Sequence, residues 1–168
     1  MSPSARHEKC KELVLRIADV IADELGSDLD SFGSTTFKNR ELGKGAEPDT
    51  CFYVQSAAAV AGKTGLDPAV DPPPDVVVEI DLAHASEGKF PFYADLRVPE
   101  LWLYDGERAR IYQLTPQGYE IAQASRAFPI LTALALTRFM AEGQAGSERA
   151  VLRSLRLWIR AERQARGE

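Results

Sequence analysis

The stretch PPPDVVVEIDLAHASEGKFPFYADLRVPELWLYD, residues 72–105, decides how the rest of the chain is arranged. Its apolar run at 76–80 contains Glu79 and is followed at once by Asp81. Side chains two residues apart in a strand lie on the same face. A nearly continuous apolar run is typical of a strand that is covered on both faces, where an ionised side chain is costly. We therefore expect Glu79 and Asp81 to share one face and to need a positively charged partner.

Lys89 is the candidate for that partner. Pro91 is tolerated only in the first turn of a helix, which predicts a short helix that starts near residues 88–90 and reaches Leu96. Lys89 then lies at the beginning of this helix, where the helix dipole does not favour a cation. Its side chain is therefore poorly placed for a partner in the helix dipole and free to point elsewhere.

The composition predicts a single domain that spans residues 1–168. A chain of 168 residues with 45% hydrophobic content can bury one ordinary core. No apolar run approaches the roughly 20 residues that span a bilayer, and the first residues lack the apolar segment of a secretion signal, so we expect a cytoplasmic protein with no membrane contact. Cys10 and Cys51 show neither zinc-ligand spacing nor a context for a disulfide, which favours buried thiols. The net charge of −5 argues against general coating of nucleic acid.

Apolar periodicity predicts a mixture of helices and strands. Helices are expected over residues 4–25, with Gly26 as the stop, over 129–140, and from the N-cap Ser147 onward. Strands are expected in six runs, around 34–37 and at 49–54, 75–81, 100–104, 109–114 and 119–122. We expect the last three to form an antiparallel extension of the sheet. The last helix carries arginines that form either a solvated face or a phosphate-binding stripe: Arg149, Arg153, Arg156, Arg160, Arg163 and Arg166.

Asp49 is a third acid that strand pairing can bring to the first two. If the strands near 49 and 75 pair antiparallel, the start of one lies beside the end of the other, next to Glu79 and Asp81. Asp75 is excluded, because four strand residues separate it from Glu79 by roughly 13 Å. Three convergent carboxylates need a cation, and an all-oxygen ligand set selects Mg²⁺ or Mn²⁺. Lys89 would supply charge to a phosphorane or a partner to attacking water, which is the chemistry of metal-assisted phosphodiester hydrolysis.

Several motifs together resemble a known family. EPDTCFYV is followed about 30 residues later by PDVVVEID, then by a lysine on the next helix and by VPELWLYDG. GSTTFK before the first acid and SRAFPIL after the sheet are also similar to that family. The chain resembles, over nearly its whole length, the Uma-type family of putative restriction endonucleases, within the PD-(D/E)XK nuclease superfamily.

The resemblance implies a restriction-endonuclease-like α/β (α+β) core, in which a central mixed sheet is flanked by helices. It matches Asp49 to the acid of the PD element and Glu79 to the acid of (D/E)XK, and it makes Glu8 a further candidate. The superfamily's lysine would stand two residues after Glu79, where this chain has Asp81. In Uma-type proteins the lysine has moved to the following helix, which is where Lys89 stands.

Two readings of function follow from these residues. In the first, the protein is a Mg²⁺-dependent endonuclease that acts on nucleic acid, with DNA as the expected substrate: Asp49 and Glu79 bind the metal, Asp81 supports it directly or through water, and Lys89 positions the nucleophilic water. In the second, the same fold is a catalytically degenerate binding or assembly module.

Three smaller points concern the same site and its assembly. His84 is either an exposed loop residue or a proton-transfer group. A Mg²⁺-dependent phosphatase shares the acids, but the sequence has no recognisable nucleophile or phosphate loop. Homodimerisation is expected by analogy with nucleases that cut two strands.

Overall fold

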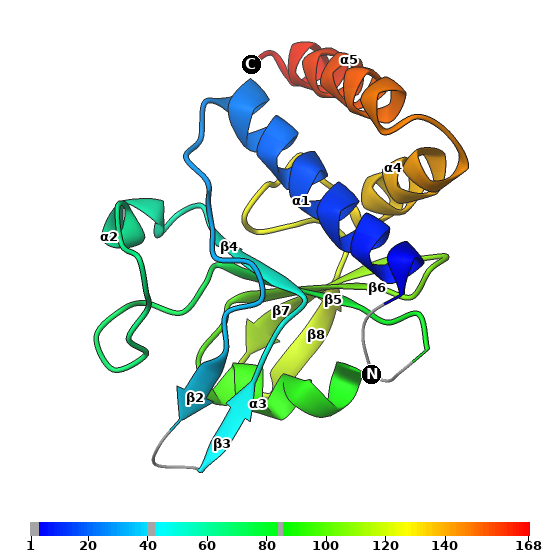
Figure 1. Ribbon diagram of the computed structural model, residues 1–168. Helices are drawn as coiled ribbons and strands as arrows, with labels where there is room; N and C mark the ends of the chain where they lie inside the picture. Colours follow the sequence, from blue (N-terminus) through cyan, green and yellow to red (C-terminus); the bar gives the residue numbers. More distant parts are fainter. Residues whose placement is uncertain (1–3, 40–42, 84–85) are drawn as a thin grey trace.

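A six-stranded mixed sheet forms the centre of the protein, as the computed structural model shows for residues 4–39, 43–83 and 86–168 (Figure 1). His84 lies outside the described residues. In spatial order the strands are β1 (Asp30–Ser31), β4 (Thr50–Tyr53), β5 (Val76–Ile80), β6 (Glu100–Tyr104), β7 (Ala109–Thr115) and β8 (Gly118–Ala122). A separate hairpin consists of β2 (Phe37–Asn39) and β3 (Lys44–Ala46). The predicted mixed α/β architecture, with helices on a central sheet, is confirmed.

The central strand β5 pairs with β4 as the sequence predicted, but its pairing with β6 differs from the prediction. β4 and β5 are antiparallel, with Thr50 opposite Val78. β6 runs parallel to β5, with Glu79 opposite Leu103, so the expectation that β6 belongs to an antiparallel extension was wrong for this pair. The connection between the two strands contains a short 3₁₀ turn, η1 (Ser86–Lys89), and α3 (Phe90–Asp95). Such a crossover is long enough to return the chain in the same direction. β7 pairs antiparallel with β6 on one side and with β8 on the other, as expected.

The helices divide between the two faces of the sheet (Figure 1). One face packs against α1 (Ala5–Leu25) and α4 (Ala133–Ala145), and the other packs against α3. α5 (Glu148–Arg166) packs on the outer side of α1 and α4. β5 contributes to both layers, because Val76 and Val78 join the first core and Val77 joins the second. All five residues of β5 are buried, which confirms that this strand is covered on both faces.

Local capping explains where the long helices begin and end. The Ser4 hydroxyl accepts a hydrogen bond from His7 N at 3.2 Å, and Gly26 ends α1 in the left-handed conformation, as predicted. Ser147 caps α5 in the same way. The helix expected over residues 129–140 instead begins at Ala133, because the Thr132 hydroxyl accepts from Ala135 N at 3.0 Å. The apolar residues before Thr132 are buried in a turn. Because they resemble a helical face in sequence, the predicted helix started too early.

The arginines of α5 take part in helix packing. Arg156 and Arg160 both bind the Glu24 carboxylate, and Arg163 donates to the Glu24 carbonyl oxygen at 2.8 Å. These contacts fasten α5 to the end of α1. A short helix, α2 (Ala57–Val60), completes the fold, and Cys10 and Cys51 are buried free thiols. Within the described ranges, every helix is too short or too polar to cross a bilayer.

Candidate active site

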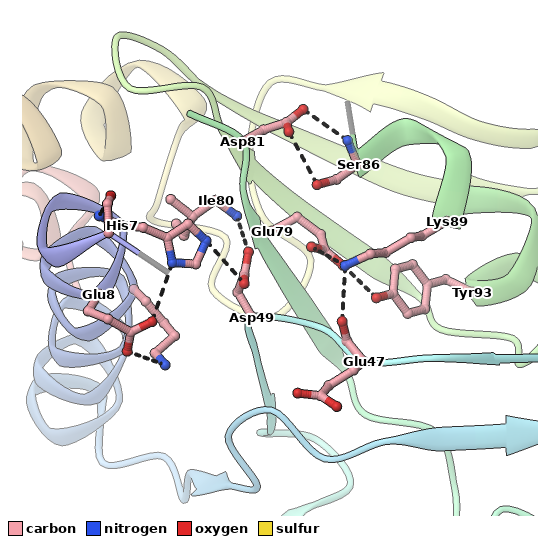
Figure 2. Close-up of polar contacts among 12 residues, drawn as sticks. His7, Glu8, Glu47, Asp49, Glu79, Ile80, Asp81, Ser86, Lys89 and Tyr93 are labelled. Carbon is pink, nitrogen blue, oxygen red and sulfur yellow. Dashed lines mark hydrogen bonds and ion pairs between the residues drawn. The ribbon is translucent and has the colours of Figure 1, made fainter. Parts of the chain in front are cut away.

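Asp49 and Glu79 are brought side by side by the antiparallel pairing of β4 and β5. Asp49 directly precedes β4, and its Oδ2 accepts a hydrogen bond from the Ile80 backbone N–H at 2.7 Å. Glu79 is the neighbour of Ile80 on β5, and its side chain points to the layer that contains α3 (Figure 2). The juxtaposition predicted from strand pairing is therefore present.

The carboxylate of Glu79 is held by three donated hydrogen bonds. The Tyr93 hydroxyl donates to Oε1 at 2.5 Å, and Lys89 Nζ donates to Oε1 at 3.0 Å and to Oε2 at 2.9 Å (Figure 2). Lys89 Nζ also donates to the Glu47 backbone oxygen at 3.0 Å. Tyr93 lies on α3 and Lys89 ends η1, so the crossover after β5 supplies both donors. The lysine thus binds the acid that the sequence analysis paired with it.

Burial dominates the electrostatics of Glu79, whose residue is only 1% exposed. Loss of hydration raises the pKa of the Glu79 carboxyl above its ordinary value. Hydrogen bonds from Tyr93 and Lys89 oppose this shift, and the negative charge of Asp49 adds to it. Burial also raises the pKa of the Tyr93 hydroxyl, which therefore remains a proton donor. The two neighbouring acids thus form a site where additional positive charge is favourable.

His7 is a residue of the site that sequence reasoning missed. Its Nε2 lies 3.2 Å from Asp49 Oδ1, and its Nδ1 lies 3.4 Å from Glu8 Oε1. Glu8 in turn pairs with Lys11 at 2.6 Å, so Glu8 reaches Asp49 only through His7. The missed signal was positional: His7 stands three residues before Cys10 on the buried stripe of α1, which continues through Val14, Ile17 and Ile21. A polar residue on that stripe points toward the sheet.

Asp81 lies one residue beyond the end of β5, and its carboxylate binds the turn that follows. It accepts hydrogen bonds from Ser86 N at 3.1 Å and from Ser86 Oγ at 3.3 Å, and Figure 2 shows its side chain directed to Ser86, away from Asp49. Over the described part of the chain, no three His, Cys, Asp or Glu side chains gather closely enough to hold a metal ion together. The expected convergence of three carboxylates is therefore not present, because strand alternation does not extend to Asp81. Its role as a metal ligand stays a prediction.

Asp75, which the sequence analysis set aside, has a structural role at the other end of β5. Its carboxylate accepts hydrogen bonds from Val54 N at 2.7 Å, from Ser56 N at 2.8 Å and from Ser56 Oγ at 3.1 Å. These bonds hold the connection between β4 and α2. Asp75 is thus occupied far from Glu79, as the strand geometry required.

The donor chemistry of Asp49 and Glu79 fits a hard divalent cation. Both side chains offer carboxylate oxygens, and the charge of Asp49 raises the pKa of the Glu79 carboxyl. Mg²⁺ needs only one or two protein carboxylates when waters and substrate phosphates complete its shell. Two adjacent carboxylates are therefore sufficient for this class of ion.

Comparison with known proteins identifies a family and a shared fold. The Uma2 family model, described as "Putative restriction endonuclease", matches residues 1–164. A crystal structure of a putative nuclease belonging to DUF820, from Anabaena variabilis ATCC 29413, is similar with a TM-score of 0.55 and 13% sequence identity, over 83% of this chain and 84% of that chain. That likeness shows a shared fold. No curated protein matches this chain.

Proposed function

This chain belongs to the Uma2 family, and from that membership we propose that it is a metal-dependent nuclease that hydrolyses phosphodiester bonds in nucleic acid, with DNA as the expected substrate. One observation carries the proposal beyond the family. The Lys89 ammonium, delivered by the turn after β5, binds both oxygens of the Glu79 carboxylate, beside Asp49. Two acids can hold a metal ion, and an amine beside them can stabilise charge that develops on a phosphate, so this set of groups suits metal-assisted phosphodiester hydrolysis.

Asp49 and Glu79 are the residues that would hold Mg²⁺ or Mn²⁺. When bound, such an ion supplies a Lewis acid for a phosphodiester oxygen and neutralises the charge of the two acids. The protein orients these ligands itself: the Ile80 N–H and the His7 imidazole contact the two oxygens of Asp49, while the Tyr93 hydroxyl contacts Glu79. Fixed ligands lower the reorganisation needed when substrate arrives.

Lys89 is the residue that we assign to the reacting phosphate and water. Its side chain is 38% exposed, whereas that of Glu79 is 2% exposed, so the amine lies between the buried acid and solvent. Its ammonium can donate to a water or to a phosphate oxygen on the solvent side while it remains beside Glu79. A cation there stabilises negative charge that develops on the phosphate.

A cleavage assay with matched lysine variants tests this assignment. Supercoiled, linear and single-stranded DNA, together with RNA, are incubated with the protein under Mg²⁺, Mn²⁺ or chelator. We expect metal-dependent cleavage that Lys89→Ala lowers by at least about 100-fold, as is typical for removal of one transition-state donor. Lys63→Ala is the control, because Lys63 is similarly exposed and pairs with Asp71 in a loop. It should leave the rate unchanged.

The competing reading is a catalytically degenerate assembly module on the same fold. It predicts that the folded protein cleaves none of these substrates with either metal. Equal loss of activity in Lys89→Ala and Lys63→Ala would likewise contradict a specific role for Lys89. Retained cleavage in Lys89→Ala would remove that lysine from the mechanism.

A further inference from the structure

We propose that Asp81 is a positioning residue for Lys89, because its carboxylate fastens the start of the 3₁₀ turn that ends with the lysine. The proposal rests on the function proposed above and deepens it. Asp81 would influence the reaction only by fixing the position of the Lys89 amine. It would not contact the metal ion or the substrate itself.

The backbone of Asp81 is held in place by the sheet. The Asp81 backbone N–H donates to the Tyr104 carbonyl oxygen at 2.7 Å, which continues the parallel pairing of β5 with β6 by one residue. From this point the carboxylate accepts from both the N–H and the hydroxyl of Ser86. Ser86 is the first residue of η1, and Lys89 is the last. The central sheet is thereby connected to the turn through one side chain.

The turn has few other restraints that could fix it. None of its four residues is buried, so no apolar packing holds η1 against the core. The helix that follows also begins without a side-chain cap, since its N-cap position is Lys89 itself. The position of the Lys89 amine therefore depends on the Asp81–Ser86 contact before it and on the packing of Phe90, Phe92 and Tyr93 after it. The bonds of Lys89 itself to Glu79 and to the Glu47 carbonyl oxygen hold the amine once the turn has placed it.

The chain provides an internal control for this arrangement. Asp75 and Ser56 make the same pair of contacts at the opposite end of β5, where an aspartate accepts from a serine N–H and hydroxyl. That pair holds the start of α2 and has no path to Lys89. Ser56→Ala and Ser86→Ala thus remove the same hydroxyl contact from an Asp–Ser pair at two places on one strand.

Chemical labelling of the metal-free protein tests the positioning role. A water-soluble acylating reagent is applied briefly, and modification of Lys89 is measured by mass spectrometry relative to Lys63. Loss of an aspartate cap shifts a local equilibrium by roughly fivefold, so we expect Asp81→Ala to raise Lys89 labelling by about that factor. Ser86→Ala should give a smaller rise, and Ser56→Ala should give none. Unchanged Lys89 labelling in both Asp81→Ala and Ser86→Ala would overturn the proposal.

Two further measurements separate this role from metal binding. Asp81→Ala should leave Mn²⁺ affinity within about twofold of the unaltered protein, while Glu79→Gln should reduce it strongly. A matching loss of affinity in Asp81→Ala would make Asp81 a ligand and overturn the positioning role. Asp81→Ala should also cause no additional loss of cleavage in a Lys89→Ala background, because residues that act through one group are not additive. The labelling needs no cleavage, so failure of the nuclease function leaves it interpretable.

Discussion

The carboxyl group of Glu79 should make the stability of the protein depend on pH. Burial raises its pKa above the ordinary value of 4.5, so the folded chain binds this proton more tightly than the unfolded chain does. The contribution of Glu79 to stability therefore falls as pH rises from about 4.5 through the raised pKa. Glu79→Gln removes this titration. We expect the unfolding free energy of Glu79→Gln, relative to the unaltered protein, to increase over that pH range.

Denaturant unfolding at a series of pH values between 4 and 8 measures this difference. Glu142→Gln is the matched control, because Glu142 lies on an exposed face of α4 and pairs with Arg138. Its stability difference should change little over the same range. A flat difference for Glu79→Gln would mean that the folded protein does not penalise ionisation at this position.

At the residues of the site, sequence reasoning succeeded where strand geometry alone decides position. Asp49, Glu79 and Lys89 follow from the pairing of two strands and from a proline that fixes the start of a helix. Asp81 failed because β5 ends at Ile80, and alternation says nothing about a side chain beyond the strand. His7 was missed because a polar residue near a helix start is usually solvated, and only the tertiary packing of α1 turns it toward Asp49.

At the scale of elements, Gly143 controls how closely α4 approaches α1. A Cβ added there would overlap Cδ2 of Leu13 on α1 and would lie 3.1 Å from Cδ1 of the same residue. Leu13 is buried and has little room to move. Alanine favours a helix over glycine by about 1 kcal/mol, but overpacking typically costs about 1–3 kcal/mol. We expect Gly143→Ala to lower the unfolding free energy by up to roughly 2 kcal/mol, the net of these two effects.

A double-mutant cycle checks that the cause is steric. Leu13→Ala makes room at the crossing, at the cost of a cavity of its own. Denaturant unfolding of both single variants and of the pair should show that Gly143→Ala costs less in the Leu13→Ala background. A stabilising effect of Gly143→Ala in the unaltered protein would contradict close packing at this position.

The elements themselves were predicted where local signals decide them. α1 and α5 follow from apolar periodicity with a serine at one end and a glycine at the other. The direction of β6 did not follow, because strand propensity carries no information about which way a neighbour runs, and the helix expected between the two strands was not used as a sign of a crossover. The start of α4 was missed because buried apolar residues in a turn have the same composition as a helical face.

At the scale of the whole molecule, the net negative charge of the chain opposes the binding of nucleic acid. A net charge of −5 repels the phosphate backbone of nucleic acid. Two arginines of α5 do not simply counter this repulsion, because Arg156 and Arg160 are paired with Glu24 of α1. In the proposed function, positive charge for the substrate would therefore come locally, from the Lys89 ammonium and from a metal ion held by Asp49 and Glu79. Homodimerisation stays a prediction, which sedimentation at two protein concentrations can test.

Local neutralisation of the site should be visible in the thermal stability of the whole protein. A ligand that binds only the folded state stabilises it by about 1.4 kcal/mol at ten times its dissociation constant. For a chain of 168 residues, this amounts to a rise of about 3–6 °C in the unfolding midpoint. We expect Mn²⁺ or Mg²⁺ to produce such a rise, saturably, as followed by calorimetry with and without chelator. Glu79→Gln should abolish the rise, and Glu142→Gln should retain it. Equal metal responses in the unaltered protein and in Glu79→Gln would show that any bound ion lies elsewhere, because the effect would then not depend on the buried acid.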